Sequence, residues 1–201
     1  MSHVEDNKRL AKNTIALYIR TLVVLLMQLF VTRLILRALG VDDFGIYNVV
    51  GSVVVLFSFL NNAMASASQR FITYELGHGT SKSISRVFSA SMTAQITIAI
   101  IMFILLGAVG YYMLNYSLNI PSDKIYSANW AFLFSMVTFC FQIVRVPFDG
   151  LVIAYEKMTF FAYASIIEVF FKLSISVFLL YSIGDRLVLY SALLTVNAFI
   201  M

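Results

Sequence analysis

Long apolar runs without a charged residue recur along this chain, and they restrict its fold more than any other feature. Residues 45–68 and 87–115 contain no Asp, Glu, Lys or Arg. An apolar stretch of about 20 residues can cross the roughly 30 Å hydrocarbon layer of a membrane as an α-helix. In lipid, only helices and closed barrels satisfy all their backbone hydrogen bonds. The runs therefore predict an all-α, polytopic transmembrane bundle.

Breaks between the apolar runs divide the chain into about six predicted spans. Turn-forming segments at 40–43, 119–123 and 184–186 mark three of the breaks, and the fourth span is predicted to stop at Pro147. The predicted spans cover residues 13–36, 45–68, 87–115, 126–146, 158–182 and 187–201. We expect residues 1–201 to form a single transmembrane domain, and the apolar end of the last span suggests the truncated, N-terminal part of a longer protein.

The composition agrees with a membrane protein and argues against several classes of function. Hydrophobic residues make up 61% of the chain and charged residues 12%, which is about half the charged share of a soluble domain. The lone cysteine, Cys140, lies within an apolar run. The sequence contains no cluster of metal ligands and no nucleophile–base or paired-carboxylate arrangement. We therefore expect no metal, no cofactor, no enzymatic activity and no nucleic-acid partner.

The basic residues between the spans predict an orientation in the membrane. Positive charge accumulates on the cytoplasmic side of membrane proteins. If the N-terminus is cytoplasmic, that side carries Lys8, Arg9, Lys12, Arg70, Lys82, Arg86, Arg145 and Lys157, and the outer side carries only Arg37, Lys124 and Arg186. The net charge of +4 is thus interpreted as a signal of orientation, with the N-terminus in the cytoplasm.

Polar side chains gather on single faces of the predicted spans. At 100° per residue these faces carry Thr14, Tyr18, Thr21, Gln28 and Thr32; Asn48, Ser52, Asn62 and Ser66; Ser135, Thr138, Gln142 and Arg145; and Ser165, Glu168, Lys172 and Ser176. Such faces are costly against lipid, so they face other helices or a water-filled cavity. Helix packing accounts for many Ser and Thr hydroxyls, which bond to their own backbone. The Asn and Gln amides leave both interpretations open.

Charged side chains inside the spans indicate a binding site more strongly, because each costs about 2.5–3.5 kcal/mol to insert near the membrane centre. Glu168 and Lys172 lie one helical turn apart, in the order that favours a pair. They form either a self-neutralised packing pair or part of a polar cavity in which Lys172 holds an anion. Arg20, Arg33 and Arg145 either extend to the headgroups or belong to that cavity. The excess of positive charge favours an anionic ligand such as phosphate.

Short segments spread over nearly the whole chain carry a family resemblance. They are Val41-Asp42-Asp43-Phe44-Gly45-Ile46-Tyr47-Asn48-Val49-Val50-Gly51, Phe57-Ser58-Phe59-Leu60-Asn61, Ala67-Ser68-Gln69-Arg70-Phe71, Ala128-Asn129-Trp130, Val146-Pro147, Ala154-Tyr155-Glu156-Lys157-Met158 and Ile166-Ile167-Glu168. In order and spacing they resemble the bacterial polysaccharide-export (O-antigen) flippases of the multidrug/oligosaccharidyl-lipid/polysaccharide superfamily, which are relatives of MATE transporters.

The resemblance implies a MATE-like fold of two six-helix lobes around a central cavity, of which this chain covers only the first. It implies a multi-pass protein of the bacterial cytoplasmic (inner) membrane. The complete protein would flip a polyprenyl-pyrophosphate-linked oligosaccharide across that membrane for O-antigen or exopolysaccharide biosynthesis, with no bond made or broken. Besides this anionic substrate and membrane lipids, the expected partners are the missing C-terminal lobe, a second copy or polysaccharide-assembly proteins.

Under this hypothesis the expected substrate-binding residues are Arg20, Lys172, Glu168, Gln28, Asn62, Gln142 and Arg145. Arg20 and Lys172 would contact the pyrophosphate or acidic sugars, Glu168 would tune Lys172, and the amides would bond sugar hydroxyls. Two alternatives stay open. One is a MATE-type, cation-coupled exporter of small molecules, in which Glu168 is the ion-linked carboxylate. The other is an inactive fragment or scaffold of such a transporter.

Overall fold

The computed structural model is all-helical, with no strand in the part of the chain that it describes. It describes residues 2–56, 58–118 and 120–201, and their side chains except at positions 2–13, 16, 58–64, 78, 81, 115 and 117. The elements are α1 (Ser2–Val55), α2 (Ser58–His78), α3 (Ser81–Tyr112), the π-helix η1 (Met113–Ser117), α4 (Ile125–Ala154), α5 (Met158–Tyr181) and α6 (Arg186–Ile200). The predicted all-α class is confirmed.

Four helices among the described residues are long and apolar enough to cross a membrane. They are the Leu17–Val55 part of α1, Lys82–Tyr112 of α3, Ile125–Ala154 of α4 and Met158–Tyr181 of α5, whereas α6 is apolar but shorter. Large apolar side chains cover their outer surfaces, for example Ile100 and Ile104 on α3 and Phe170 and Phe178 on α5. Lipid solvates such surfaces and water does not, so the chain forms a membrane-spanning helical bundle.

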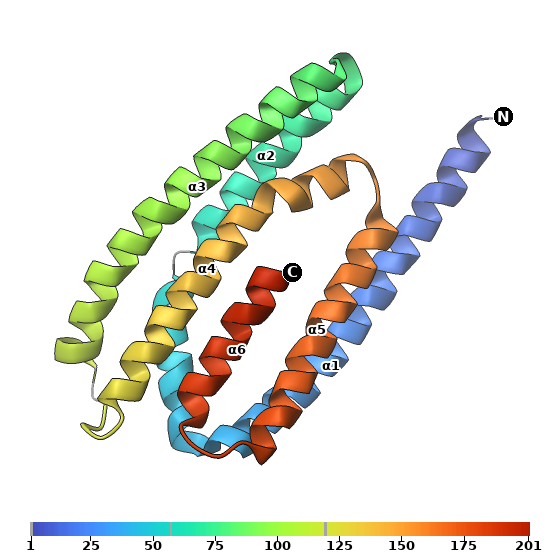
Figure 1. Ribbon diagram of the computed structural model, residues 1–201. Helices are drawn as coiled ribbons and strands as arrows, with labels where there is room; N and C mark the ends of the chain where they lie inside the picture. Colours follow the sequence, from blue (N-terminus) through green and yellow to red (C-terminus); the bar gives the residue numbers. More distant parts are fainter. Residues whose placement is uncertain (1, 57, 119) are drawn as a thin grey trace.

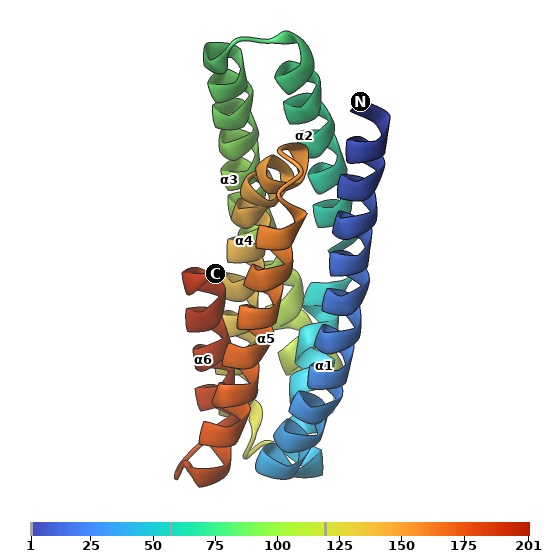
Figure 2. The same cartoon turned by 90° about the vertical axis from the view of Figure 1, so that its right-hand side faces the viewer.

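The chain reverses direction at the bend within α1 and at each connection from α2 to α6, whereas the second part of α1 and α2 run the same way (Figures 1 and 2). The α2–α3 and α4–α5 connections lie at the same end as the N-terminus, and the bend within α1, the α3–α4 loop and the α5–α6 turn lie at the other end. The bend falls at Gly40, where φ is 81° and ψ is 174°. Glycine adopts a positive φ without steric cost. The bend lies in the 40–43 segment that was predicted to separate the first two spans.

The second predicted span, at 45–68, is not one continuous helix. Helix α1 ends at Val55 and α2 begins at Ser58, so this span is divided between the second part of α1 and the first part of α2. Gly, Val, Ser and Asn are common in this stretch, and they are weaker helix formers than Ala or Leu. Hydropathy does not register such a break, because both sides of it are apolar.

The predicted stop of the fourth span at Pro147 is wrong, because α4 continues through Pro147 to Ala154. Pro147 is fully buried. The turn beyond it packs closely on α2, where a Cβ on Gly150 would lie 3.5 Å from the backbone nitrogen of Gln69. Neighbouring helices allow prolines inside membrane helices. Figure 1 shows the last turns of α4 bent toward α5, as expected of a proline kink.

Helix α4 is the central element of the bundle, since it contacts each of the other α-helices. Its contact with α3 is close at Gly110, where an added Cβ would collide with the ring of Phe132. Its buried face carries Ala131, Phe132, Met136, Phe139 and Ile143. Another side of α4 faces α1, α5 and α6. A polar residue on that side therefore lies between those helices.

Polar contacts tie the elements together at the end that carries the Gly40 bend. Lys124 pairs with Asp43 at 2.8 Å, and Arg186 donates to the carbonyl oxygen of Ala38 at 2.8 Å. Ser127 donates to Asp185, whose carboxylate also caps the start of α6. The hydrogen bond to Asp43 raises the pKa of Lys124. These contacts fix the starts of α4 and α6 against the bend in α1.

Candidate functional site

A polar pocket of about 330 Å³ opens between α1, α4, α5 and α6, and it is the candidate site. Its polar lining comes from Gln28, Thr32, Tyr47 and Asn48 of α1, Thr138, Gln142 and Arg145 of α4, Glu168 and Lys172 of α5, and Tyr190 and Asn197 of α6. Four helices thus place amides, hydroxyls and charges around one space inside an apolar bundle. We call this space the polar pocket below.

Glu168 connects the charged groups of the polar pocket. Its Oε1 accepts from Lys172 Nζ at 2.8 Å, and its Oε2 accepts from Arg145 Nη1 at 3.0 Å. The first contact joins residues one turn apart on α5, and the second crosses from α5 to α4. Arg145 also pairs with Asp149 through Nε at 3.3 Å. Arg145 therefore points toward Glu168 and Asp149.

The two cations keep donors that these bonds do not use. An ammonium has three N–H donors and a guanidinium has five, and the structure gives Lys172 one such bond and Arg145 two. The side chains of Arg145, Glu168 and Lys172 are 26%, 24% and 31% exposed. Within its own lining the polar pocket holds two cations and one anion. It therefore presents free donors, while Asp149 balances the charge of Arg145 from outside the lining.

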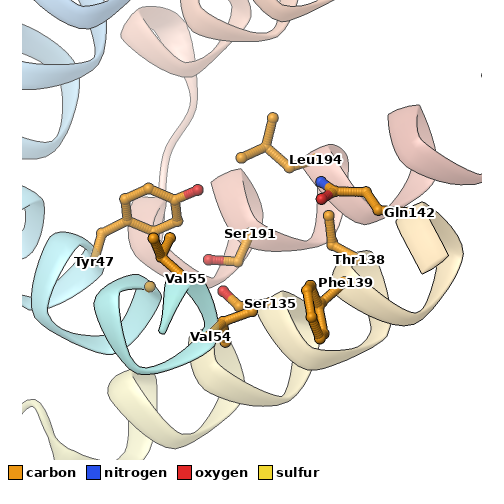
Figure 3. Close-up of a pocket in the computed structure, with 10 residues that line it drawn as sticks. Tyr47, Val54, Val55, Ser135, Thr138, Phe139, Gln142, Ser191 and Leu194 are labelled. Carbon is orange, nitrogen blue, oxygen red and sulfur yellow. The ribbon is translucent and has the colours of Figure 1, made fainter. Parts of the chain in front are cut away.

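A second cavity of about 180 Å³ continues from the polar pocket along α4 and α6 (Figure 3). The two spaces share Tyr47, Thr138, Gln142 and Leu194 in their linings. Around the second cavity, Figure 3 shows the side chains of Ser135 and Ser191 beside those of Tyr47, Thr138 and Gln142. Together they form one trough, charged at one end and lined at the other by hydroxyl and amide groups together with Val54, Val55, Phe139 and Leu194.

The structure brings together five of the residues that the sequence indicated. Gln28, Gln142, Arg145, Glu168 and Lys172 all line the polar pocket. The amide side chains of Gln28 and Gln142 are exposed to it, as groups that bind a ligand must be.

Arg20 and Asn62 are the two other residues that the sequence indicated for the binding site. Arg20 does not line the polar pocket, and its guanidinium carbon lies 4.6 Å from the ring centre of Phe161 on α5. Arginine stacks readily on aromatic rings in this way. Its Nε is enclosed and has no hydrogen-bond partner. The side chain of Asn62 lies outside the described residues.

Several hydroxyls on the predicted polar faces bond to their own helices. Thr32 donates to the carbonyl of Gln28, Ser165 to Phe161 and Ser176 to Lys172, at 2.7–2.9 Å. This favours the helix-packing interpretation for Ser165 and Ser176, which are buried. Thr138 differs, because its hydroxyl lies 3.0 Å from that of Thr195 on α6 and lines the trough.

Sequence reasoning missed the contribution of α6 and of the aromatic residues. Tyr47 and Tyr190 meet edge to face, with ring centres 5.0 Å apart, and both line the polar pocket. Asn197 is 6% exposed and also lines it. A polar residue within a short apolar helix was the available signal for Asn197. The tyrosines carried no such signal, because aromatic residues are common throughout the chain.

Comparisons with protein-family models, with curated proteins and with solved structures found no match to this chain. Among the described residues, the structure contains no group of three or more His, Cys, Asp or Glu side chains that could hold a metal ion. The trough carries amide and hydroxyl groups and the charged side chains of Arg145, Glu168 and Lys172.

Proposed function

We propose that this chain is one lobe of a bacterial flippase that carries a polyprenyl-pyrophosphate-linked oligosaccharide across the cytoplasmic membrane. One observation carries the proposal: the Arg145–Glu168–Lys172 cluster lines a pocket between membrane-spanning helices and continues into a trough of amides and hydroxyls. Charged groups inside a membrane bundle are costly and characteristically line substrate pathways. The resemblance of the chain to polysaccharide-export flippases supplies the identity of the substrate in this proposal.

The chemistry of the trough suits both parts of such a substrate. Pyrophosphate is an anion, and the free donors of Lys172 and Arg145 meet that charge with directed hydrogen bonds. Sugar hydroxyls both donate and accept, as the exposed amides of Gln28 and Gln142 also do. A water-filled trough lets these groups exchange water for substrate. An alternating-access mechanism would then open it to each side of the membrane in turn.

The engagement of Glu168 argues against a cation-coupled drug exporter. A coupling cation that approached Glu168 would meet the charges of Arg145 and Lys172, which both oxygens of Glu168 already contact. Drug susceptibility of cells that express the complete gene separates the two functions, and under our proposal it does not change.

Alanine substitutions in the complete gene test the proposal in cells. Lys172→Ala removes the cation that contacts Glu168 in the polar pocket, and Gln142→Ala removes an exposed amide of the same pocket. We expect both variants to insert normally and to lose surface polysaccharide. Arg33→Ala is the matched control, because Arg33 is an exposed arginine on α1 that does not line the polar pocket. Normal export by both variants would contradict the proposal.

A further inference from the structure

Exposed tyrosine side chains and the single tryptophan gather at the two ends of the bundle. The end that carries the Gly40 bend has Tyr111 and Tyr112 of α3, Tyr116 of η1, Tyr126 and Trp130 of α4, and Tyr181 of α5. We call them the bend-end rings. The other end has Tyr18 of α1, Tyr74 of α2, Tyr155 just beyond α4, and Tyr163 of α5, which we call the far-end rings. Figures 1 and 2 place the end of α3, the start of α4 and the end of α5 at the same end of the bundle.

The surface between these two groups of rings is apolar. The exposed large side chains of α5 between Tyr163 and Tyr181 are Ile167, Phe170, Phe171, Val177 and Phe178. On α1, the exposed large side chains that follow Tyr18 include Leu22, Leu25, Leu26, Leu29 and Phe30. None of these aliphatic and phenyl groups forms hydrogen bonds, whereas a tyrosine hydroxyl or an indole N–H does. The two tyrosines outside the end groups, Tyr47 and Tyr190, line the polar pocket.

Charged residues lie just outside the rings. Along the chain through α5 the order is Lys157, Tyr163, the apolar surface, Tyr181 and Arg186. A bilayer has the same order of layers, from water through headgroups to hydrocarbon and back again. Tyrosine and tryptophan are enriched at the headgroup level, because an apolar ring and a polar tip suit a boundary between hydrocarbon and water.

The distance between the rings on α5 matches the thickness of a membrane. Tyr163 and Tyr181 are 18 residues apart on one helix. At 1.5 Å per residue this separation is about 27 Å, and the hydrocarbon core of a bilayer is roughly 30 Å thick. Lys172 lies nine residues from each of them.

We infer that the bend-end rings and the far-end rings lie in the two headgroup layers of the bilayer, with the hydrocarbon core between Tyr163 and Tyr181 and Lys172 at its middle. A protein partner could cover one group of rings, but it would not require a second group one membrane thickness away. At the middle of the core the ammonium of Lys172 is as far as possible from both headgroup layers, so the polar pocket solvates it. This inference goes beyond the proposed function, because it requires membrane insertion and no transport.

Quenching of fluorescence by brominated lipids tests the inference, because Trp130 is the only tryptophan in the chain. The full chain is placed in vesicles of phosphatidylcholine that carries bromine on its acyl chains, either near the glycerol or near the chain ends. We expect the shallow bromines to quench Trp130 about twofold more than the deep bromines do. Equal quenching by the two lipids, or stronger quenching by the deep bromines, would overturn the inference. Absence of quenching by both lipids would overturn it as well, since a protein contact would then cover the ring.

Single tryptophans at other positions, each in a Trp130→Phe chain, test the depth of α5. Tyr163→Trp and Tyr181→Trp should show the same preference for shallow bromines. Phe170→Trp is the matched comparison, because Phe170 is exposed and lies two residues from Lys172. It should show the opposite preference, about twofold in favour of the deep bromines. A shallow preference at position 170 would contradict the placement of Lys172. Export is not measured, so these outcomes stand apart from those for the proposed function.

Discussion

Arg145 of α4 donates to Glu168 of α5 across 3.0 Å, while Lys172 occupies the other oxygen of the same carboxylate. The carboxylate thus lies between two cations that come from different helices. If it is neutralised, Lys172 loses its ion pair and Arg145 keeps only the one with Asp149. The cluster therefore contributes to the stability of the bundle as well as to the charge of the polar pocket.

Glu168→Gln should destabilise the bundle by about 1–3 kcal/mol, because it leaves the partly buried Lys172 without its anion and Arg145 with Asp149 alone. Reversible unfolding in mixed micelles measures the change. The double variant Glu168→Gln/Lys172→Met should lose less stability than the sum of the single variants, since the cation that Glu168→Gln leaves unpaired is then absent. Asp42→Asn, at an exposed carboxylate, serves as the control and should change stability by less than about 0.5 kcal/mol. Strict additivity in the double variant would contradict the shared carboxylate.

The spacing of Glu168 and Lys172 was enough to predict their contact, because residues one turn apart on a helix face the same way. The bond from Arg145 was not predictable, since it depends on how α4 lies against α5. The predicted stop at Pro147 was wrong for a similar reason. Proline usually ends a helix, and the predicted stop used that local rule. In the bundle, the packing of α2 on the following turn keeps α4 helical.

Polar faces were a partial guide to the site. Thr14, Tyr18 and Thr21 share a face with Gln28 and Thr32 on α1, but only Gln28 and Thr32 line the polar pocket. Angular position on a helix wheel does not give depth along the bundle. The amides and charges near the middle of the spans marked the site better than the hydroxyls, because hydroxyls can be satisfied by their own helix.

Gly110 and Gly107 of α3 offer a matched test of the α3–α4 contact. A Cβ at Gly110 would collide with the ring of Phe132, whereas at Gly107 the nearest atom is Met136 Cε at 3.9 Å. We expect Gly110→Ala to destabilise the bundle by about 1–3 kcal/mol through overpacking. Gly107→Ala should be neutral, or stabilising by up to about 1 kcal/mol, because alanine is the better helix former. Thermal unfolding in detergent distinguishes them, and equal effects would argue against this packing.

The Lys124–Asp43 pair lies at the end of the bundle that carries the Gly40 bend. It predicts that the stability of the bundle depends on pH. The hydrogen bond to Asp43 raises the pKa of Lys124 above its ordinary value of 10.5. Because the pKa is raised in the folded state, the stabilisation is fully present below 10.5 and is lost as the pH rises through the higher, folded value. Lys124→Met should therefore cost about 1 kcal/mol at neutral pH, because Asp43, whose side chain is only 15% exposed, loses its partner. The difference from the wild type should shrink at strongly alkaline pH. A difference that already disappears on mild alkalinisation would contradict this.

Water access to the trough is the central claim, and cysteine labelling tests it most directly. In a chain with Cys140→Ala, Gln28→Cys and Gln142→Cys should react rapidly with a water-soluble thiosulfonate, because the thiolate forms only where water reaches. Ile104→Cys and Phe178→Cys lie on exposed apolar surfaces of α3 and α5, and they should react slowly. If positions 28 and 142 prove as unreactive as positions 104 and 178, the trough is dry and the proposed site is wrong.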